Sequence, residues 1–370
     1  MAWETDNLGG QRAAGANIRE DLSNMISNIS RDETPFLSAI GTNKAKGPLH
    51  EWLTDEYASP GENKFEEGFT FDSTRAGNRQ VARDRLDNRT QIFGKDIISA
   101  GTVQSSDVAG VANEFAYQLK KAGVKLRRDI EFQTLRYSAS NQANVGNAVK
   151  VAKSGATRGQ MGSVFSYVPN WFNATGDGVL RNRTATGNVG AAGAAGANLF
   201  GQVADGASLV QFATAPAANV APAREHFEGL IAQMHRADGK PNVAFIPVGV
   251  RTAVSSLFAD GSSGSAERRI DAMMKKLNIS IMGVMTDFGV DIALVHDYIM
   301  DGPAGGTGSG ADNVILLADT SKVKSSLLTP VATEEDRVAR YGRAAIMYCE
   351  ETTEVMNPNG LGAITGVRGS

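Results

Sequence analysis

The sequence contains few of the residues from which enzymes and metalloproteins usually build their sites. It has one cysteine, Cys349, and four histidines among 370 residues. A single cysteine excludes an intramolecular disulfide framework, and the histidines do not show the spacing of a metal-ligand motif. Cys349 lies in a strand-like run beside Glu350 and Glu351, which disfavour a thiolate. We therefore expect it to be a small buried residue.

Long hydrophobic runs and an excess of one charge are also missing. The longest nearly apolar run, residues 243–250, is far shorter than the roughly 20 residues of a membrane-spanning helix. The N-terminus shows no secretory signal, so we expect the chain to be made and kept inside the cell, away from membranes. Lysine and arginine total 37 against 40 acids, which leaves a net charge of −3. A protein that wraps DNA usually carries a basic excess, so DNA binding is not expected to be its main task.

Two short patterns resemble catalytic or nucleotide-binding motifs, but each lacks the residues that would complete it. Asp287-Phe-Gly289 matches the metal-binding triplet of kinases without their catalytic loop or their phosphate-covering loop. Residues 305–310 are rich in glycine but lack the Lys-Ser/Thr of a phosphate loop. We therefore expect no catalytic residues, no cofactor and no metal site.

The N-terminal quarter reads as extended structure around a polar segment. An apolar fraction of 42% over 370 residues allows two or three structural units. Residues 1–47 look like an arm, with an amphipathic stretch from Ile18 to Ile29. Residues 48–57 and 89–98 alternate like strands, and the polar residues between them cannot bury a core of their own. The sequence therefore predicts a long two-stranded arm.

The charges of this predicted arm are segregated along the chain. Residues 51–72 hold seven acids and one lysine, whereas residues 75–89 hold five arginines and two acids. One interpretation is a solvated surface loop. The alternative is an arm that lies on a neighbouring copy of the chain, where its charges determine which surface it binds and in what alignment. The candidate interface residues are Glu51, Asp55, Glu56, Glu62, Lys64, Glu66, Glu67, Arg75, Arg79, Arg83, Arg85 and Arg89.

Residues 107–138 carry the strongest periodic signal and predict one long helix. Apolar residues recur there at spacings of three and four, and Asp107 can cap the start. About 30 residues would give a helix about 45 Å long. Its apolar face is expected to pack against strands from residues 344–367. The predicted core residues of the helix are Val111, Phe115, Leu119, Leu126 and Ile130.

The C-terminal half alternates between helix and strand patterns after a loop-rich connection. Residues 140–222 contain aromatic anchors, which are Phe165, Tyr167, Trp171 and Phe172. From residue 226 to residue 318, helical and strand patterns follow one another. The tail, residues 344–367, alternates like a hairpin with Asn357-Pro-Asn-Gly360 at its turn.

Five segments, taken in order, carry a resemblance to a known family. They are Thr34-Pro-Phe-Leu-Ser-Ala-Ile-Gly41, His50-Glu-Trp-Leu-Thr-Asp-Glu-Tyr-Ala-Ser-Pro-Gly61, Thr90-Gln-Ile-Phe-Gly-Lys95, Glu114-Phe-Ala-Tyr-Gln-Leu-Lys-Lys-Ala-Gly123 and Leu126-Arg-Arg-Asp-Ile-Glu131. Together they resemble tailed-bacteriophage major capsid proteins with the Hong Kong 97-type fold. The resemblance runs from about residue 21 to the C-terminus and is strongest over residues 34–131.

The resemblance implies an α+β, Hong Kong 97-like capsid fold and a structural, non-enzymatic function. The implied parts are an N-terminal arm (1–47), an extended β-hairpin loop or E-loop (48–99), a peripheral domain with the spine helix 107–138 (100–224), an axial α/β domain (225–312), and strands that return to the peripheral domain (313–370). Hexamers and pentamers of the chain would form an icosahedral shell around double-stranded phage DNA. The protein would occupy the host cytoplasm during assembly and the virion capsid afterwards.

The resemblance also implies partners and one covalent bond. The main partner is the chain itself, and a separate scaffold protein is expected because matching begins near residue 21. A portal and decoration proteins are further expected partners, and packaged DNA would make only weak nonspecific contacts with the inner face. Some relatives join an extended-loop lysine to a peripheral-domain asparagine, and the candidates here are Lys64 with Asn357 or Asn359. Two alternatives stay open: a bacterial encapsulin-like nanocompartment shell with the same fold, and a soluble α/β enzyme, which would need a polar cleft.

Overall fold

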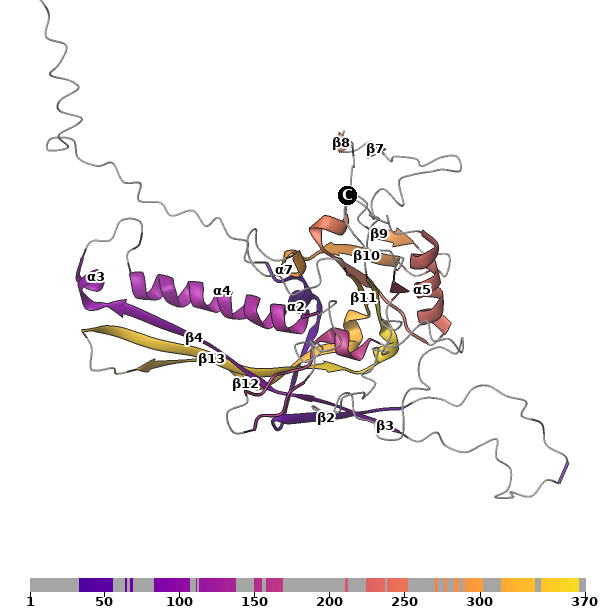
Figure 1. Ribbon diagram of the computed structural model, residues 1–370, viewed down its shortest axis with the longest axis horizontal. Helices are drawn as coiled ribbons and strands as arrows, with labels where there is room; N and C mark the ends of the chain where they lie inside the picture. Colours follow the sequence, from indigo (N-terminus) through magenta and orange to yellow (C-terminus); the bar gives the residue numbers. More distant parts are fainter. Residues whose placement is uncertain are drawn as a thin grey trace, which may run out of the picture. The chain divides into compact units, whose positions relative to one another are not determined.

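A computed structural model gives the fold of the chain (Figure 1). It describes residues 33–55, 64, 67–68, 83–106, 111, 113–137, 150–154, 158–168, 210–211, 224–236, 238–251, 270–271, 276–277, 283–285, 289, 291–301, 314–336 and 341–365. The chain divides into two compact units. The first unit comprises Met1–Asp32, Lys95–Lys125 and Thr333–Met347, and the second comprises Glu33–Gly94, Leu126–Ala332 and Tyr348–Ser370.

A four-stranded sheet has the strand order β1-β12-β13-β4. The strands are β1 (Gly41–Lys44), β12 (Val323–Asp336), β13 (Gly342–Val355) and β4 (Gln91–Ala100). β1 runs parallel to β12, with Gly41 opposite Lys324. Along β4, Phe93 and Ile97 are buried whereas Ile92 and Ile98 are exposed, so the two-residue period of the strand turns one face toward the core.

The long helix, α4 (Glu114–Thr134), is shorter than the predicted range 107–138. The Oδ1 atom of Asn113 accepts a hydrogen bond from the Ala116 amide at 3.1 Å, so Asn113 caps the helix. A short helix, α3 (Gly101–Ser105), precedes it, and Asp107 lies outside the described residues. The prediction was too long because Val111 continues the apolar period while lying ahead of the capped start of the helix.

The predicted apolar face of α4 lies on one side of the helix. Phe115, Leu126 and Ile130 are buried, and Val111 and Leu119 are half-buried. Within the first unit, the Arg343 guanidinium lies over the Phe115 ring at 4.3 Å, and Met347 packs beside Gly123. The N-terminal part of α4 therefore packs on β13, and the helix continues through Gly123 without interruption.

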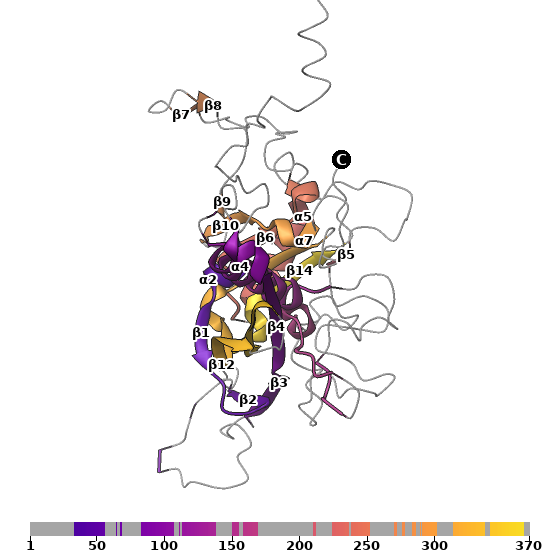
Figure 2. The ribbon, with the colours of Figure 1, turned by 90° about the vertical axis from the view of Figure 1, so that its left-hand side faces the viewer.

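A six-stranded mixed sheet in the second unit has the order β5-β14-β11-β6-β10-β9 (Figures 1 and 2). The strands are β5 (Val210–Gln211), β14 (Leu361–Thr365), β11 (Ile315–Ala318), β6 (Val243–Ile246), β10 (Asp291–His296) and β9 (Gly283–Met285). Helix α5 (Arg224–Arg236) packs on β14, where a Cβ at Gly362 would lie 2.6 Å from the Met234 sulfur. A larger residue at position 362 would require the Met234 side chain to shift.

The C-terminal tail is not the hairpin that its alternation indicated. β13 pairs within the four-stranded sheet, whereas β14 pairs with β11 in the six-stranded sheet. The turn η6 (Pro358–Gly360) thus carries the chain from one sheet to the other, beside the crossing from β11 through η5 (Thr320–Lys322) to β12. Asp319 N donates to Gly360 O at 2.9 Å and Met356 N donates to Lys322 O at 2.8 Å, which ties the two crossings together.

The predicted part 313–370 supplies strands to both sheets. β11 and β14 pair in the six-stranded sheet, whereas β12 and β13 pair in the four-stranded one. Alternation reveals that a segment is a strand, but it carries no information on the sheet in which the strand pairs.

The predicted two-stranded arm is described only at its base, where its second strand differs from the prediction; most of residues 56–82 lie outside the described residues. β2 (Leu49–Thr54) pairs antiparallel with β3 (Asp84–Arg89), and Trp52 lies opposite Leu86. The predicted partner, residues 89–98, falls mostly in β4 of the four-stranded sheet. β3 escaped prediction because its sequence, Asp-Arg-Leu-Asp-Asn-Arg, offers one apolar residue and so no alternation.

Three short elements contribute buried residues to the core of the second unit: α2 (Pro35–Ala39), η3 (Val164–Tyr167) and α7 (Tyr298–Asp301). β7 (Ile270–Asp271) and β8 (Lys276–Leu277) pair with each other in a separate two-stranded sheet. Phe36 of α2 packs edge-on against Phe245, with ring centroids 5.0 Å apart. Phe165 and Tyr167 are buried as anchors, whereas Trp171, Phe172 and the amphipathic stretch from Ile18 lie outside the described residues. Within the described part, none of the helices has the length and apolar character needed to span a bilayer.

Candidate assembly interface

The β2–β3 ribbon (residues 49–54 and 84–89) presents two chemically different faces. The two strands run side by side in both ribbon views (Figures 1 and 2). On one face, Leu86 is buried and the Trp52 ring lies 6.0 Å from the Tyr167 ring. On the other face, Leu49 and Leu53 are exposed, and 64% of the Leu53 surface is accessible. One face therefore belongs to the core of the second unit and the other is left without a cover among the described residues.

Three consecutive residues of β13 hold the inner face of the ribbon. Asn88 Nδ2 donates to the Thr353 carbonyl at 2.7 Å, and Trp52 Nε1 donates to the Val355 carbonyl at 2.8 Å. Between them, His50 Nε2 lies 3.1 Å from the Glu354 carboxylate. These three contacts fix both strands of the ribbon to one end of a sheet strand.

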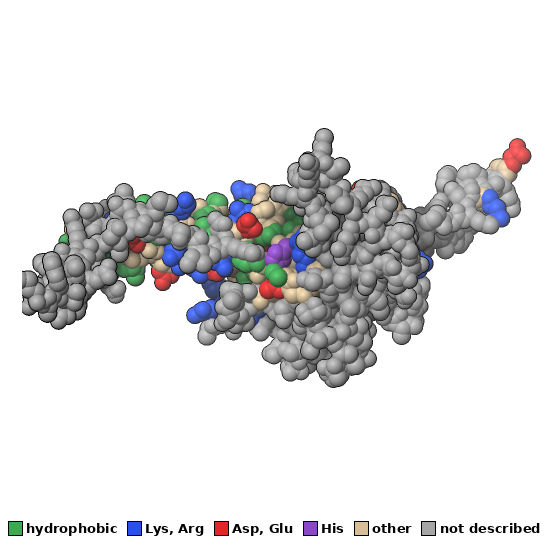
Figure 3. All heavy atoms as spheres, turned by 90° about the horizontal axis from the view of Figure 1, so that it is seen from above, with side chains coloured by type: hydrophobic (Ala, Val, Ile, Leu, Met, Phe, Trp, Pro, Cys, Tyr) green, Lys and Arg blue, Asp and Glu red, His purple; other side chains and the backbone are tan. Residues whose placement is uncertain are grey.

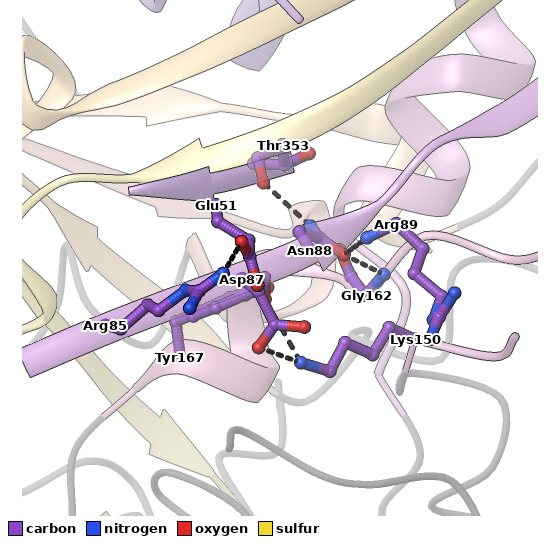
Figure 4. Close-up of polar contacts among 9 residues, drawn as sticks. All are labelled: Glu51, Arg85, Asp87, Asn88, Arg89, Lys150, Gly162, Tyr167 and Thr353. Atoms are coloured by element: carbon purple, nitrogen blue, oxygen red, sulfur yellow. Dashed lines mark hydrogen bonds and ion pairs between the residues drawn. The ribbon is translucent and has the colours of Figure 1, made fainter. Parts of the chain in front are cut away.

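We call the end of the ribbon that these contacts hold on β13 its root. Asn88 lies at the centre of the root and is fully buried. Besides Thr353, its amide nitrogen donates to the Gly162 carbonyl at 3.3 Å. Its Oδ1 accepts from the Gly162 amide at 2.9 Å and from the Arg89 amide at 2.8 Å. Figure 4 shows the side chain lying between Thr353 and Gly162. The amide thus fills all four of its hydrogen-bonding positions, and any other side chain would leave buried groups unpaired.

A second buried contact holds Asp87 of the same strand. Lys150 Nζ lies 2.5 Å from Asp87 Oδ1 and 3.2 Å from the Asp87 carbonyl, which also accepts from the Tyr167 hydroxyl at 2.9 Å (Figure 4). Burial lowers the pKa of Lys150, and Asp87 opposes that change. Burial raises the pKa of Tyr167 well above its usual range, which keeps the phenol protonated as a donor. The pair therefore acts as a fixed structural contact. Removal of either side chain would leave the other as a buried charge without a counter-charge.

Glu354 connects the ribbon root to two further strands. Burial would raise the pKa of this carboxyl group, but hydrogen bonds from Asn43, His50 and Ser326 outweigh burial, and its pKa lies below the ordinary value. The Asn43 amide and the Ser326 hydroxyl both lie 2.8 Å from the same carboxylate oxygen. The charged form of Glu354 is thus the one that joins β1, β2 and β12.

Farther from the root, the predicted interface charges pair with one another inside the ribbon. Arg83 Nε lies 3.1 Å from Asp55 Oδ2, and Arg85 forms an ion pair with Glu51. The antiparallel register explains this, because it brings the acidic strand beside the arginine-rich one. Charge segregation along the sequence is therefore accounted for near the root by contacts within one chain.

The remaining predicted residues are only partly visible. Lys64 and Glu67 are exposed and Arg89 is half-buried; Glu56, Glu62, Glu66, Arg75 and Arg79 lie outside the described residues. Of the two cross-link candidates, Asn359 is buried, and Asn357 is half-buried with its Oδ1 accepting from the Asn359 amide at 3.0 Å. The sequence reading missed Asn88, Lys150 and Gly162, because a polar residue that is buried by tertiary contacts leaves no periodic signal.

The rest of the described surface offers no competing site. Within the described ranges, no group of three or more His, Cys, Asp or Glu side chains could hold a metal ion. Cys349 is buried, and burial raises its pKa to about 12, so the thiol is unreactive. On the part of the face drawn in Figure 3 that the structure describes, basic side chains lie among acidic and hydrophobic ones.

Comparisons with known proteins point to one family. The model of the SU10 major capsid protein family matches residues 5–368. The major capsid protein of Escherichia phage Phieco32 is 32% identical over 112 residues, which cover 30% of this chain and 30% of that protein. A solved structure of Gordonia phage Cozz is similar in fold, with a TM-score of 0.55, 10% identity and coverage of 99% of this chain and 96% of that one. The capsid of a native GTA particle gives a TM-score of 0.54 at 11% identity, covering 96% and 98%.

Proposed function

The chain belongs to the SU10 major capsid protein family, and we propose that it assembles as hexamers and pentamers into an icosahedral shell around double-stranded phage DNA. The observation that carries this proposal is the β2–β3 ribbon, which is rigidly held at its root and presents exposed leucines on its outer face. Such a face is what a second copy would cover, because exposed aliphatic side chains gain free energy on burial.

We assign the parts of the capsid fold as follows. Residues 1–47 form the N-terminal arm, whose strand β1 joins the four-stranded sheet. Residues 48–99 form the extended loop, which has the ribbon as its root and enters the same sheet through β4. The four-stranded sheet and α4 form the peripheral domain, with α4 as its spine helix. The six-stranded sheet with α5 belongs to the axial domain, which then includes β11 and β14. This assignment is supported by the two separate sheets and by the residues that each contains.

The extended loop is proposed to lie over a neighbouring subunit. Near the root its charges pair within the ribbon, so the apolar face around Leu53 supplies the contact area there. The described ion pairs then act by holding the ribbon straight, and the loop residues outside the described ranges supply the charges that select the partner.

Further partners follow from the same family membership. We infer a separate scaffold protein, a portal and decoration proteins, with packaged DNA in weak contact with the inner face. The mature location is the virion, after assembly in the host cytoplasm. A covalent link between Lys64 and Asn357 of different subunits is retained as a proposal, because Asn357 is the more accessible of the two candidate asparagines. Denaturing gel electrophoresis of assembled particles tests it: species larger than the 39.0 kDa monomer are expected, and monomer alone would exclude the link.

Electron microscopy of the purified chain tests the shell function. Wild-type protein should form closed particles, whereas Leu53→Asp should stay as small soluble species with an unchanged circular dichroism spectrum. Val248→Asp serves as the matched control, since Val248 is also an exposed aliphatic residue but lies outside the loop. Particles of normal yield from Leu53→Asp would refute the role of the ribbon face, and the absence of particles from wild type under all assembly conditions would refute the shell.

A further inference from the structure

Two carboxyl groups from distant parts of the chain, those of Glu131 and Asp297, are hydrogen-bonded to each other in the interior of the second unit. Glu131 stands near the C-terminal end of α4, and Asp297 stands between β10 and α7. Both residues are completely buried. A single buried carboxylate is unfavourable without a counter-charge, and two adjacent carboxylates are far more so.

The hydrogen bonds of the two carboxyl groups connect each of them to the start of a short helix. The two Glu131 oxygens accept from the backbone amides of Phe36 at 3.2 Å and Leu37 at 3.3 Å, the start of α2. Asp297 Oδ1 accepts from the Ile299 amide at 2.9 Å, at the start of α7. Asp297 Oδ2 is buried and receives no hydrogen bond from an amide or hydroxyl group of the described residues. The donor left for it is a proton on the neighbouring Glu131.

The charged groups on the surrounding elements do not neutralise the pair. On α4, Arg127 donates to the Ser38 hydroxyl at 3.0 Å, and the Arg128 guanidinium lies over the Tyr298 ring at 5.6 Å. On the sheet side, His296 favours an ionised Asp297 and Asp301 disfavours it. The described part of the chain contains no lysine or arginine in an ion pair with either carboxyl group.

We propose that Glu131 and Asp297 share one proton and form a latch that fastens α2 to α4 and to the β10–α7 connection, and that opens when the proton is lost in alkaline solution. α2 lies within the proposed N-terminal arm (residues 1–47), so the latch holds this part of the arm on the second unit. The inference needs only the geometry of one chain and does not depend on shell formation.

The pH at which the latch opens follows from the environment of Glu131. Burial, followed by the charge of Asp297 and the hydrogen bond to it, raises the pKa of Glu131 from 4.5 to about 9. A raised pKa means that the folded chain keeps a proton that the unfolded chain releases above pH 4.5. The stabilisation from this proton is therefore complete in acid, declines as the pH rises, and is lost above about pH 9.

Glu131→Gln tests the latch, because the glutamine oxygen can accept from one of the two α2 amides and its NH2 group can donate to Asp297 without titrating. The melting temperature of the wild type should fall between neutral pH and pH values above 9, and that of the variant should fall less steeply over this interval, because Cys349 and Glu351 still contribute to the slope. Hydrogen exchange, corrected for the intrinsic rate, should show protection of residues 35–39 lost in alkaline wild type and kept in the variant. Equal alkaline slopes for the two proteins would overturn the proposal.

Two further measurements keep the test decisive. Infrared spectroscopy at neutral pH should detect the carbonyl stretch of a protonated carboxylic acid in wild type and a weaker band in Glu131→Gln; identical bands would refute the shared proton.

If Glu131→Gln does not fold, Asp297→Asn replaces it, since asparagine keeps the acceptor for Ile299 and removes one charge. A smaller reduction of the alkaline slope is expected, because burial of Glu131 remains while the charge of Asp297 is gone, and an unchanged slope would contradict the latch. Glu354→Gln is the matched control: it alters a buried glutamate that has no acidic neighbour, so its alkaline slope should equal that of wild type.

Discussion

The root of the ribbon and the ribbon beyond it are built on opposite principles. At the root, Asn88 and Lys150 are buried, and their hydrogen bonds are made to residues of other segments. Beyond it, Asp55 and Arg83 are exposed and form an ion pair across the two strands. Buried polar contacts specify a single geometry, whereas exposed ion pairs add little free energy. The direction of the ribbon is thus set by buried contacts within one subunit, whereas its exposed ion pairs contribute little to its stability.

The largest loss of folding stability is expected from a substitution in α4, outside the ribbon, and it serves as the reference for the ribbon variants. Phe115→Ala removes a buried ring from the spine helix and should destabilise the fold by about 3–5 kcal/mol. Chemical denaturation of the soluble protein measures this value, and the variant should accumulate as insoluble or unassembled protein. Val103→Ala, at a more exposed site in the same unit, is the control. Normal yields of intact particles from Phe115→Ala would contradict the importance of this face.

Asn88→Ala should come next and would show that the root is structural. The change leaves buried backbone groups of Gly162 and Thr353 without a hydrogen-bond partner. Each unpaired group lowers the free energy of unfolding by about 1–3 kcal/mol before relaxation, so a total loss of about 3 kcal/mol is expected. Thermal and chemical unfolding measure it. Asn242→Ala removes an exposed asparagine that bonds Thr320, and it should cost less than about 1 kcal/mol. Similar losses from the two variants would remove the distinction between buried root and exposed surface.

A smaller, pH-dependent effect is expected where Glu354 joins the root to β13. Its pKa is depressed in the folded chain, so its contribution is present above the unfolded value of 4.5 and is lost as the pH falls through the folded value. Glu354→Gln should therefore lower stability at neutral pH by about 2 kcal/mol, as for hydrogen bonds to a charged group, and should have little effect in acid. Unfolding curves over this pH range decide; a constant difference between the two proteins would be inconsistent with the assignment.

The smallest expected effect on stability belongs to the outer ribbon. Arg83→Ala and Arg85→Ala should leave the melting temperature of the unassembled subunit unchanged, because both side chains are exposed. Their effect should appear in the rate of assembly and in its dependence on salt, measured by light scattering. A clear loss of subunit stability from either variant would show that the outer ribbon is also held by its own chain.

The sequence predicted the elements better than their connections. The apolar face of α4 and the strand β2 were readable because burial on one side imposes a period. β3 has one apolar residue, Leu86, and so was not recognised, and the tail was assigned to one hairpin although β13 and β14 belong to different sheets. Asn88 and Glu131 could not be singled out, because the partners that give them their roles lie 265 and 95 residues away along the chain. Those contacts exist only after folding.

The paired crossings between the two sheets have a mechanical consequence. β11 continues into β12 and β13 continues into β14, and the hydrogen bonds of Asp319 and Met356 bridge the two passages. A pulling force on the six-stranded sheet is therefore divided between two covalent strands that are clamped side by side. Two parallel connections joined by hydrogen bonds resist stretching and twisting. They resist bending less when the bend is perpendicular to the plane that contains both connections. Deformation of the subunit under internal pressure should accordingly follow a single axis at this junction.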